Sequence, residues 1–212
     1  MHASSVRNMR EFFKEYSRPG NLVLDVGSQS VMGNASKYKE TALGHCCTYK
    51  GLDVIEGRNV DIVVPSPYKW ACIKTNSYDI VISGQTFEHI QFFWLTFMEM
   101  ARVLKPNGYL CLIVPSTGYY HSTPIDCWRF KNDSMQALAA WSVIVRRPVS
   151  LLDTYIDMTS EWGDCVGVFR KGKKDTRNKN IAKISFTGIV GDGKDKTGDA
   201  APMKLTINKG RK

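Results

Sequence analysis

The chain has 212 residues, of which 43% are hydrophobic and 23% are charged. This is close to the composition of an ordinary globular domain and excludes wholesale disorder, collagen and coiled coil. No apolar run approaches the roughly 18 residues of a membrane helix. The first ten residues lack the apolar stretch of a secretion signal, and the six cysteines include no CxxC pair. We therefore expect a cytoplasmic protein with no membrane span, with buried, reduced thiols and with no metal site.

The net charge of +9 is concentrated at the C-terminal end. Residues 1–170 hold 17 Lys and Arg against 16 Asp and Glu, whereas residues 171–212 hold 12 Lys and Arg against 4 Asp. A nearly neutral body favours a small-molecule partner over a polyanion. The sequence therefore predicts one domain over residues 1–170 and a basic tail over residues 171–212. This tail is expected to be either flexible or a loose hairpin, with pairing between residues 181–190 and 203–207.

Hydrophobic periodicity predicts alternating helices and strands along the body. Apolar residues spaced by three and four predict helices over residues 6–16, 92–104 and 132–141. Short apolar runs predict strands over residues 22–27, 49–54, 59–64, 78–83, 109–114, 142–145 and 165–169. This order indicates an α/β fold with a mostly parallel sheet, in which ligands bind at the carboxyl ends of the strands.

Three features fall at those strand ends. Asp25-Val26-Gly27-Ser28 ends the first strand, and its glycine allows close backbone approach to a ligand and frees amide groups to point at it. Asp53 ends the second strand, where a carboxylate can accept two hydrogen bonds from a ribose diol. Gly84 to His89 follow the fourth strand. Together they predict a pocket for a nucleoside-containing cofactor, although a turn glycine and a strand-end cap are the alternatives for the first two. The absence of GxxxxGK[ST] excludes a P-loop NTPase, and the absence of an intact GxGxxG argues against a dinucleotide-binding fold.

Residues 21–116 resemble the class I, Rossmann-like methyltransferases that use S-adenosylmethionine. The resemblance is clearest from Tyr78 to Ser116, where Phe87-Glu88-His89-Ile90 is followed by Ala101-Arg102-Val103-Leu104-Lys105-Pro106-Asn107-Gly108. It implies a seven-stranded, mostly parallel sheet flanked by helices, with S-adenosylmethionine as the cofactor. The cofactor-binding residues that it implies are Asp25, Gly27, Ser28, Asp53, Val54, Tyr68, Gly84 and Gln85.

The sequence departs from the family pattern in two places. Gln29 and Val31 replace the second and third glycines of the first motif, and Gly33 is the candidate for the turn instead. Where an acid often meets adenine, the chain has Pro65-Ser66-Pro67-Tyr68. We therefore predict that Tyr68 or Trp70 stacks on adenine.

The loop after the fifth predicted strand carries the candidate catalytic base, His121, since an imidazole titrates near neutral pH. Its stretch reads H-x-x-P-x-D-x-x-R-F and is similar to that of small methyltransferases linked to sugar and surface-glycan pathways. Candidate acceptor contacts are Glu88, His89, Asp126 and Arg129. The alternatives are a loop-packing role for His121, an ion pair between Asp126 and Arg129 that stiffens the loop, and a helix-start role for Glu88 and His89.

The function predicted from these residues is methyl transfer from S-adenosylmethionine to a small-molecule or sugar acceptor at oxygen. Two alternatives stand beside it. The basic tail would suit an RNA or DNA methyltransferase. The altered glycine motif would suit a cofactor-binding or scaffold protein without transferase activity.

Overall fold

The computed structural model describes residues 2–30, 37–122 and 125–172, together with residues 185–186 and 205–206. The chain forms two compact units, Met1–Lys174 and Asp175–Lys212. In the second unit, strand β8 (Ser185–Phe186) pairs antiparallel with β9 (Leu205–Thr206), within the two segments expected to form a hairpin. No helix among the described residues is long and apolar enough to cross a membrane.

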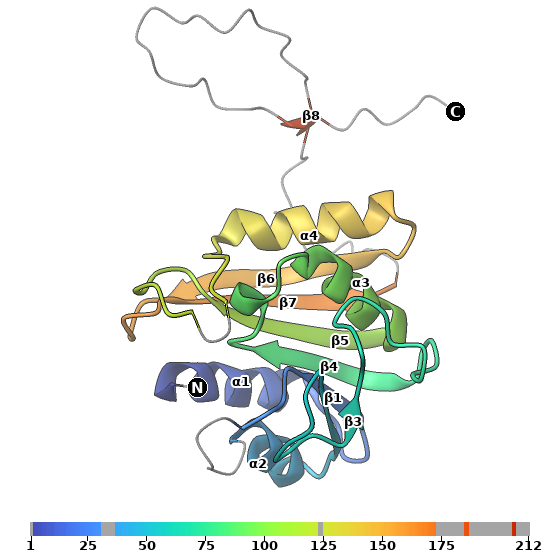
Figure 1. Cartoon of the computed structure of the whole chain (residues 1–212). Coiled ribbons are helices and arrows are strands. Elements are labelled where there is room, and N and C mark those ends of the chain that lie inside the picture. Colours follow the sequence, from blue (N-terminus) through green and yellow to red (C-terminus); the bar gives the residue numbers. More distant parts are fainter. Residues whose placement is uncertain (1, 31–36, 123–124, 173–184, 187–204, 207–212) are drawn as a thin grey trace, which may run out of the picture. The chain divides into compact units, whose positions relative to one another are not determined.

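The first unit is built on a seven-stranded sheet with the order β3-β2-β1-β4-β5-β7-β6 (Figure 1). Neighbouring strands from β3 to β5 pair in parallel, and β7 runs antiparallel to both β5 and β6. This confirms the predicted Rossmann-like, mostly parallel sheet. The strands are β1 (Leu22–Val26), β2 (Thr48–Asp53), β3 (Ile62–Val63), β4 (Tyr78–Gly84), β5 (Leu104–Pro115), β6 (Val149–Asp157) and β7 (Asp164–Lys171).

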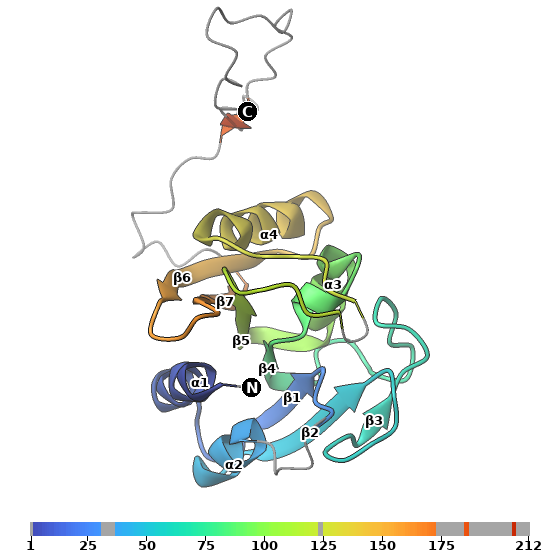
Figure 2. The same cartoon turned by 60° about the vertical axis from the view of Figure 1, so that its left-hand side comes forward.

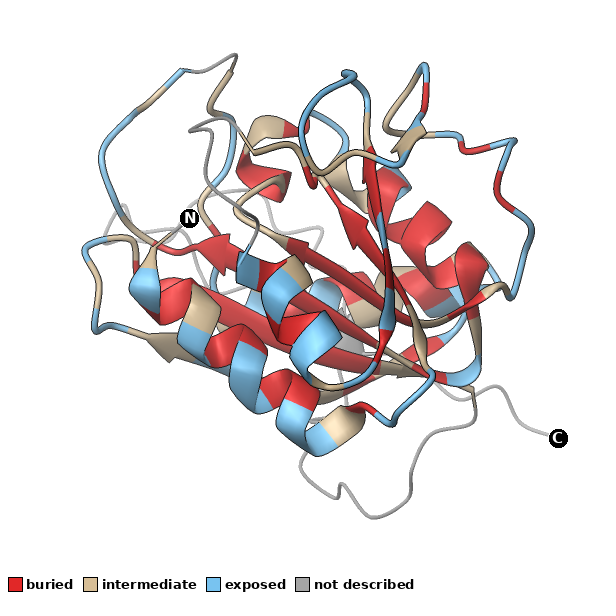
Figure 3. Ribbon diagram, turned by 90° about the horizontal axis from the view of Figure 1, so that it is seen from below, coloured by how far each residue is buried: buried red, intermediate tan, exposed pale blue. Residues whose placement is uncertain are grey.

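Helices cover both faces of the sheet. Figure 2 shows α1 (Ala3–Tyr16) and α2 (Lys37–Gly44) on one face, and α3 (Phe93–Val103) and α4 (Asn132–Ile144) on the other. Side chains alternate between the faces along each strand, so Ile80 and Ile82 pack with α1 and Val81 packs with α3. In Figure 3 the strands and the inner sides of the helices are accordingly buried. Burial on both faces explains why the strands read as continuous apolar runs.

Several predicted boundaries differ from the structure. Residues 142–145 were expected to form a strand, but they end α4, and the edge strand is β6. The Ser142 hydroxyl donates to the Ala139 carbonyl within the helix and accepts from the Val149 amide at the start of β6. Helix α2 and the early start of β5 at Leu104 were not predicted. A short run of β-branched residues does not distinguish a strand from the last turn of a buried helix.

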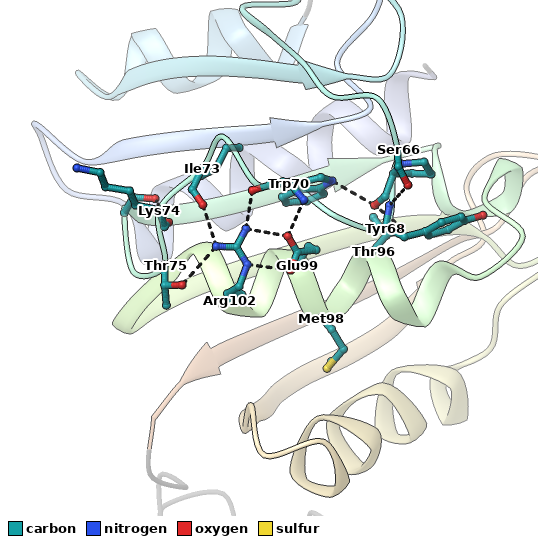
Figure 4. A network of polar contacts seen from close by, with 12 residues as sticks. Ser66, Tyr68, Trp70, Ile73, Lys74, Thr75, Thr96, Met98, Glu99 and Arg102 are labelled. Carbon is teal, nitrogen blue, oxygen red and sulfur yellow. Dashed lines mark hydrogen bonds and ion pairs between the residues drawn. The ribbon is translucent and has the colours of Figure 1, made fainter.

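The segment between β3 and β4 forms no helix over residues 64–77 and is held by one arginine of α3 (Figure 4). The Arg102 guanidinium donates to both Glu99 carboxylate oxygens, at 2.7 and 2.8 Å. It also donates to the carbonyls of Trp70 (2.9 Å) and Ile73 (2.8 Å). Glu99 in turn accepts from the Trp70 amide. This network fixes the loop that follows the carboxyl end of β3.

Candidate functional site

The carboxyl ends of β1 and β2 lie side by side, with Val26 opposite Leu52. Gly27 follows with a φ of +78°, a conformation that favours glycine. The amides of Gly27 and Ser28 both donate to the Leu52 carbonyl, at 2.9 and 3.1 Å. The Ser28 hydroxyl donates to the Asn59 carbonyl at 3.1 Å. The expectation that this turn leaves its amides free for a ligand is therefore wrong for Gly27 and Ser28.

The two candidate glycines make room for side chains of the protein. A methyl group on Gly27 would overlap the side chain of Thr86, and one on Gly84 would overlap the phenol of Tyr38. Tyr38 is buried and its hydroxyl is hydrogen-bonded to that of Ser5, at 2.5 Å. Glycine at these two positions is thus required by packing within the described residues. Val31 and Gly33 lie outside the described residues.

Asp53 presents a carboxylate at the end of β2. One of its oxygens accepts from the Gln29 amide at 3.0 Å, and the other accepts from the Val54 amide at 2.7 Å. A carboxylate has about four acceptor positions, so each oxygen keeps capacity for a further donor. Val54 and Ile55 follow with exposed apolar side chains. The end of β2 therefore combines a hydrogen-bond acceptor with an apolar surface.

Asp25 is buried behind the turn and is hydrogen-bonded to another side chain of the protein. Its carboxyl is buried and accepts from the Tyr49 hydroxyl at 2.6 Å, and Tyr49 accepts from the Asn59 amide group at 2.8 Å. Burial raises the pKa of Asp25 to about 7, against the effect of the Tyr49 hydrogen bond, and the charge of Asp53 adds to the rise. Asp25 is therefore a buried carboxyl behind the turn that is hydrogen-bonded within the protein.

The two aromatic candidates for an adenine platform differ. Trp70 is fully buried in the core, and its indole donates to the Pro67 carbonyl, so the expectation that Trp70 stacks on adenine is wrong. Tyr68 is half-buried and its ring lies 5.5 Å from that of Phe92. Of the two residues, only Tyr68 keeps part of its ring accessible.

Gln85 follows β4 with a φ of +55° and is fixed at both ends. Its backbone amide donates to the Ile113 carbonyl at 2.8 Å, and its side-chain amide group donates to the Asp164 carboxylate at 2.8 Å. Asp164 is fully buried at the start of β7, and His2 approaches the same Asp164 oxygen at 3.4 Å. The sequence did not reveal this contact, because 79 residues separate Gln85 from Asp164.

The loop after β5 holds His121 against a buried carboxylate. Asp126 accepts from the His121 amide at 2.8 Å, and the same oxygen lies 3.2 Å from His121 Nδ1. The Arg129 guanidinium donates to both oxygens of Asp126. These hydrogen bonds from Arg129 hold the pKa of Asp126 well below its usual range. The ion pair expected to stiffen this loop is present, and it also orients the imidazole.

Glu88 and His89 lie under this loop on a separate 3-10 turn, η1 (Phe87–His89), ahead of α3 rather than at its start. The Cys127 amide donates to the Glu88 carbonyl at 2.7 Å and ties the loop to η1. The rings of His89 and His121 are 5.0 Å apart. Glu88 is 1% exposed, and burial raises the pKa of its carboxyl to about 8. Its Oε2 has no hydrogen-bond partner among the described residues.

An aromatic wall completes this cluster. The Trp162 ring lies 4.8 Å from the rings of His121 and Tyr119, and it stacks on His2 at 5.5 Å. Figure 1 shows the N-terminus of α1 and the loop after β5 at the same edge of the sheet.

Comparisons with known proteins identify the family. Residues 24–112 match the family model of a methyltransferase domain. This match covers less than half of the chain, and together with the shared fold it supports a class I methyltransferase that uses S-adenosylmethionine. The predicted resemblance is thereby confirmed. A search of curated proteins finds no match.

Solved structures share the fold of this chain at low sequence identity. The 1,6-didemethyltoxoflavin-N1-methyltransferase of Burkholderia thailandensis superposes with a TM-score of 0.62 and 14% identity, over 80% of this chain and 79% of that one. A SAM-dependent methyltransferase from Aquifex aeolicus gives 0.53 and 16%, over 80% and 98%. The [4+2]-cyclase SpnF gives 0.60 and 15%, over 80% and 81%. The fold is thus shared by proteins named for different reactions.

The predicted site residues of this methyltransferase form two groups. Residues at the ends of β1 and β2 surround Asp53 and form the candidate cofactor side. Residues of η1 and the loop after β5 surround His121 and form the candidate acceptor side, which we call the acceptor cluster: Glu88, His89, His121, Asp126 and Arg129. Gln85 follows β4 and Asp164 begins β7, and these two strands flank β5 in the sheet.

Proposed function

We propose that this methyltransferase transfers a methyl group from S-adenosylmethionine to a hydroxyl oxygen of a small-molecule or sugar acceptor. The observation that carries the proposal is the arrangement of His121, which a buried carboxylate orients at the same edge of the sheet as the β2 carboxylate. In open α/β sheets, ligands bind outside the carboxyl ends of the strands.

The residues at the end of β2 fit the cofactor. Asp53 keeps acceptor capacity for the ribose hydroxyls, and Val54 offers exposed apolar surface beside it. Tyr68 is the aromatic side chain left for adenine. Gly84 and Gln85 lie at the end of β4, where they would face the methionine end of the cofactor. When bound, S-adenosylmethionine supplies an electrophilic methyl group on a sulfonium.

His121 has the tautomer that a general base needs. Both neighbours of its Nδ1, the Asp126 carboxylate and the Tyr119 carbonyl, can only accept hydrogen bonds, so Nδ1 carries the proton. Nε2 then holds a lone pair. As the acceptor oxygen forms its bond to the methyl group and the bond from sulfur to that methyl breaks, the hydroxyl proton passes to His121 Nε2. Asp126 stabilises the imidazolium that results.

The remaining acceptor contacts are proposed from the same cluster. The His89 ring lies 5.0 Å from that of His121 and Glu88 lies beside it, so these two residues would hold the acceptor hydroxyl. Arg129 donates to both carboxylate oxygens of Asp126. We propose that Asp126 positions His121, and that the outer side of the Arg129 guanidinium contacts the acceptor.

A second candidate function is cofactor binding without methyl transfer. It is favoured by the two glycine positions, whose space Thr86 and Tyr38 fill, and by the missing glycines at residues 29 and 31. An RNA or DNA methyltransferase would draw on the basic tail, residues 171–212, since the rest of the chain is nearly neutral.

Two measurements test these proposals. The first is calorimetry with S-adenosylmethionine on the full chain and on Asp53→Ala, with Asp133→Ala, an exposed carboxylate of α4, as the matched control. The second is transfer of a labelled methyl group to nucleotide sugars, small phenols and RNA. Binding without transfer to any acceptor would favour the non-catalytic candidate. No binding at all would refute the cofactor assignment.

A further inference from the structure

We infer that Glu88, His89 and His121 form a binding site for a divalent transition-metal cation of the zinc type. One ligand atom from each of these residues lies within 4.8 Å of the others. This inference rests on the proposed function in one respect only, the naming of this location as the acceptor side. The site itself follows from three side chains and their partners.

In each imidazole, Nε2 is the nitrogen left for a metal ion. The His89 Nδ1 lies 2.5 Å from the Ile125 carbonyl, which can only accept, so Nδ1 carries the proton and Nε2 is free. His121 has the same tautomer, fixed by Asp126 and Tyr119. Metal-binding histidines are commonly held in this way, with one ring nitrogen donating to a carbonyl or carboxylate and the other on the metal. The two rings lie 5.0 Å apart at an interplanar angle of 85°.

Glu88 supplies the third ligand and the negative charge. Its side chain is 2% exposed, its Oε1 lies 3.7 Å from His89 Nε2, and its Oε2 has no hydrogen-bond partner among the described residues. A buried carboxyl without a partner is costly, and a bound cation would remove that cost. Burial raises the pKa of the Glu88 carboxyl, although the charge of Arg129 opposes the rise.

The donor set selects the class of metal. Two imidazole nitrogens and one carboxylate suit zinc and neighbouring first-row cations, whereas Mg²⁺ prefers oxygen ligands and retains water. Three protein ligands leave at least one position open, as in catalytic zinc sites. A hydroxyl coordinated there would have a lowered pKa and could release its proton to bulk water. Because the cation takes the Nε2 lone pair of His121, metal binding and proton acceptance exclude each other at that atom.

The test measures metal binding without cofactor or acceptor. The protein is the full chain, treated with EDTA, in which the three exposed cysteines, Cys46, Cys72 and Cys127, are replaced by serine to remove competing thiolates. Zn²⁺ binding is followed by calorimetry, and Co²⁺ binding is followed by its visible absorption bands. Mg²⁺ serves as the control cation. We expect one Zn²⁺ per chain and no Mg²⁺ binding of comparable affinity.

Variants assign the bound ion to the cluster. His121→Ala and Glu88→Gln should each weaken Zn²⁺ binding by at least about 100-fold, since even outer partners of metal ligands contribute roughly 10–100-fold. His45→Ala, which removes a partly exposed imidazole of the α2–β2 connection, should leave binding unchanged. The melting temperature of each metal-free variant shows that it is folded.

Two outcomes would overturn the inference. One is that the serine-substituted protein, with Glu88, His89 and His121 intact, takes up no Zn²⁺. The other is binding that survives Glu88→Gln and His121→Ala alike, which would place the ion elsewhere. Calorimetry with S-adenosylmethionine on the same metal-free protein tests the proposed function separately, so that failure of either proposal leaves the other intact.

Discussion

Replacement of Glu88 by glutamine should stabilise the metal-free protein, and the gain should depend on pH. Burial raises the pKa of this carboxyl from 4.5 to about 8. Between these values the unfolded chain has released the proton that the folded chain retains, so stability falls as pH rises through this window. Glutamine has nearly the same shape and binds no proton, which removes that pH dependence.

The size of the effect follows from the shift. At 1.36 kcal/mol per pKa unit, the wild-type carboxyl costs about 3 kcal/mol at pH 7. For a chain of this length, that corresponds to a melting temperature roughly 6–12 °C higher in Glu88→Gln at pH 7, with no difference below pH 4.5. Because Asp25 also has a raised pKa and is unchanged in both proteins, its contribution cancels in the comparison.

Differential scanning calorimetry of both proteins in EDTA, at intervals from pH 4.5 to pH 8, provides the measurement. Two parallel curves, with the same difference at every pH, would show that Glu88 does not titrate in this window. That result would refute the reasoning from burial. A wild type that gains stability on addition of Zn²⁺ at pH 7, where Glu88→Gln does not, would connect the same carboxyl to the inferred metal site.

Three other substitutions test separate parts of the structure. Asp53→Ala should weaken S-adenosylmethionine binding in calorimetry by about 1.5–3 kcal/mol, the scale of hydrogen bonds to a charged group, and equal affinity in a folded variant would contradict the ribose assignment. His121→Ala should lower turnover by about 10²–10⁴-fold in a methyl-transfer assay with an unchanged cofactor Kd, and normal turnover would leave it a structural role. Arg102→Ala should lower the free energy of unfolding in urea by about 2–3 kcal/mol, because Glu99 and the loop carbonyls lose their donor. A smaller loss would mean that the loop holds its place without the guanidinium.

Local sequence determined much of the fold of this methyltransferase. The apolar runs that form β1 and β4 are buried on both faces, and a run of that kind is recognisable within a few residues. Asp53, the acid that ends β2, could also be located from sequence, because a strand end and the charged residue on it are adjacent in the chain. The family resemblance rested on similarly local stretches.

Contacts between distant residues decided the site. The pairing of Gly27 and Ser28 with the Leu52 carbonyl, and the burial of Trp70 beneath Arg102, were not apparent from residue spacing. The approach of His89 to His121 also depends on where the loop after β5 folds back. A side chain's periodicity reports only which face it occupies, whereas its partners depend on strand order and loop path, which form only when the sheet assembles. The chemistry of the acceptor cluster is therefore a property of the tertiary structure.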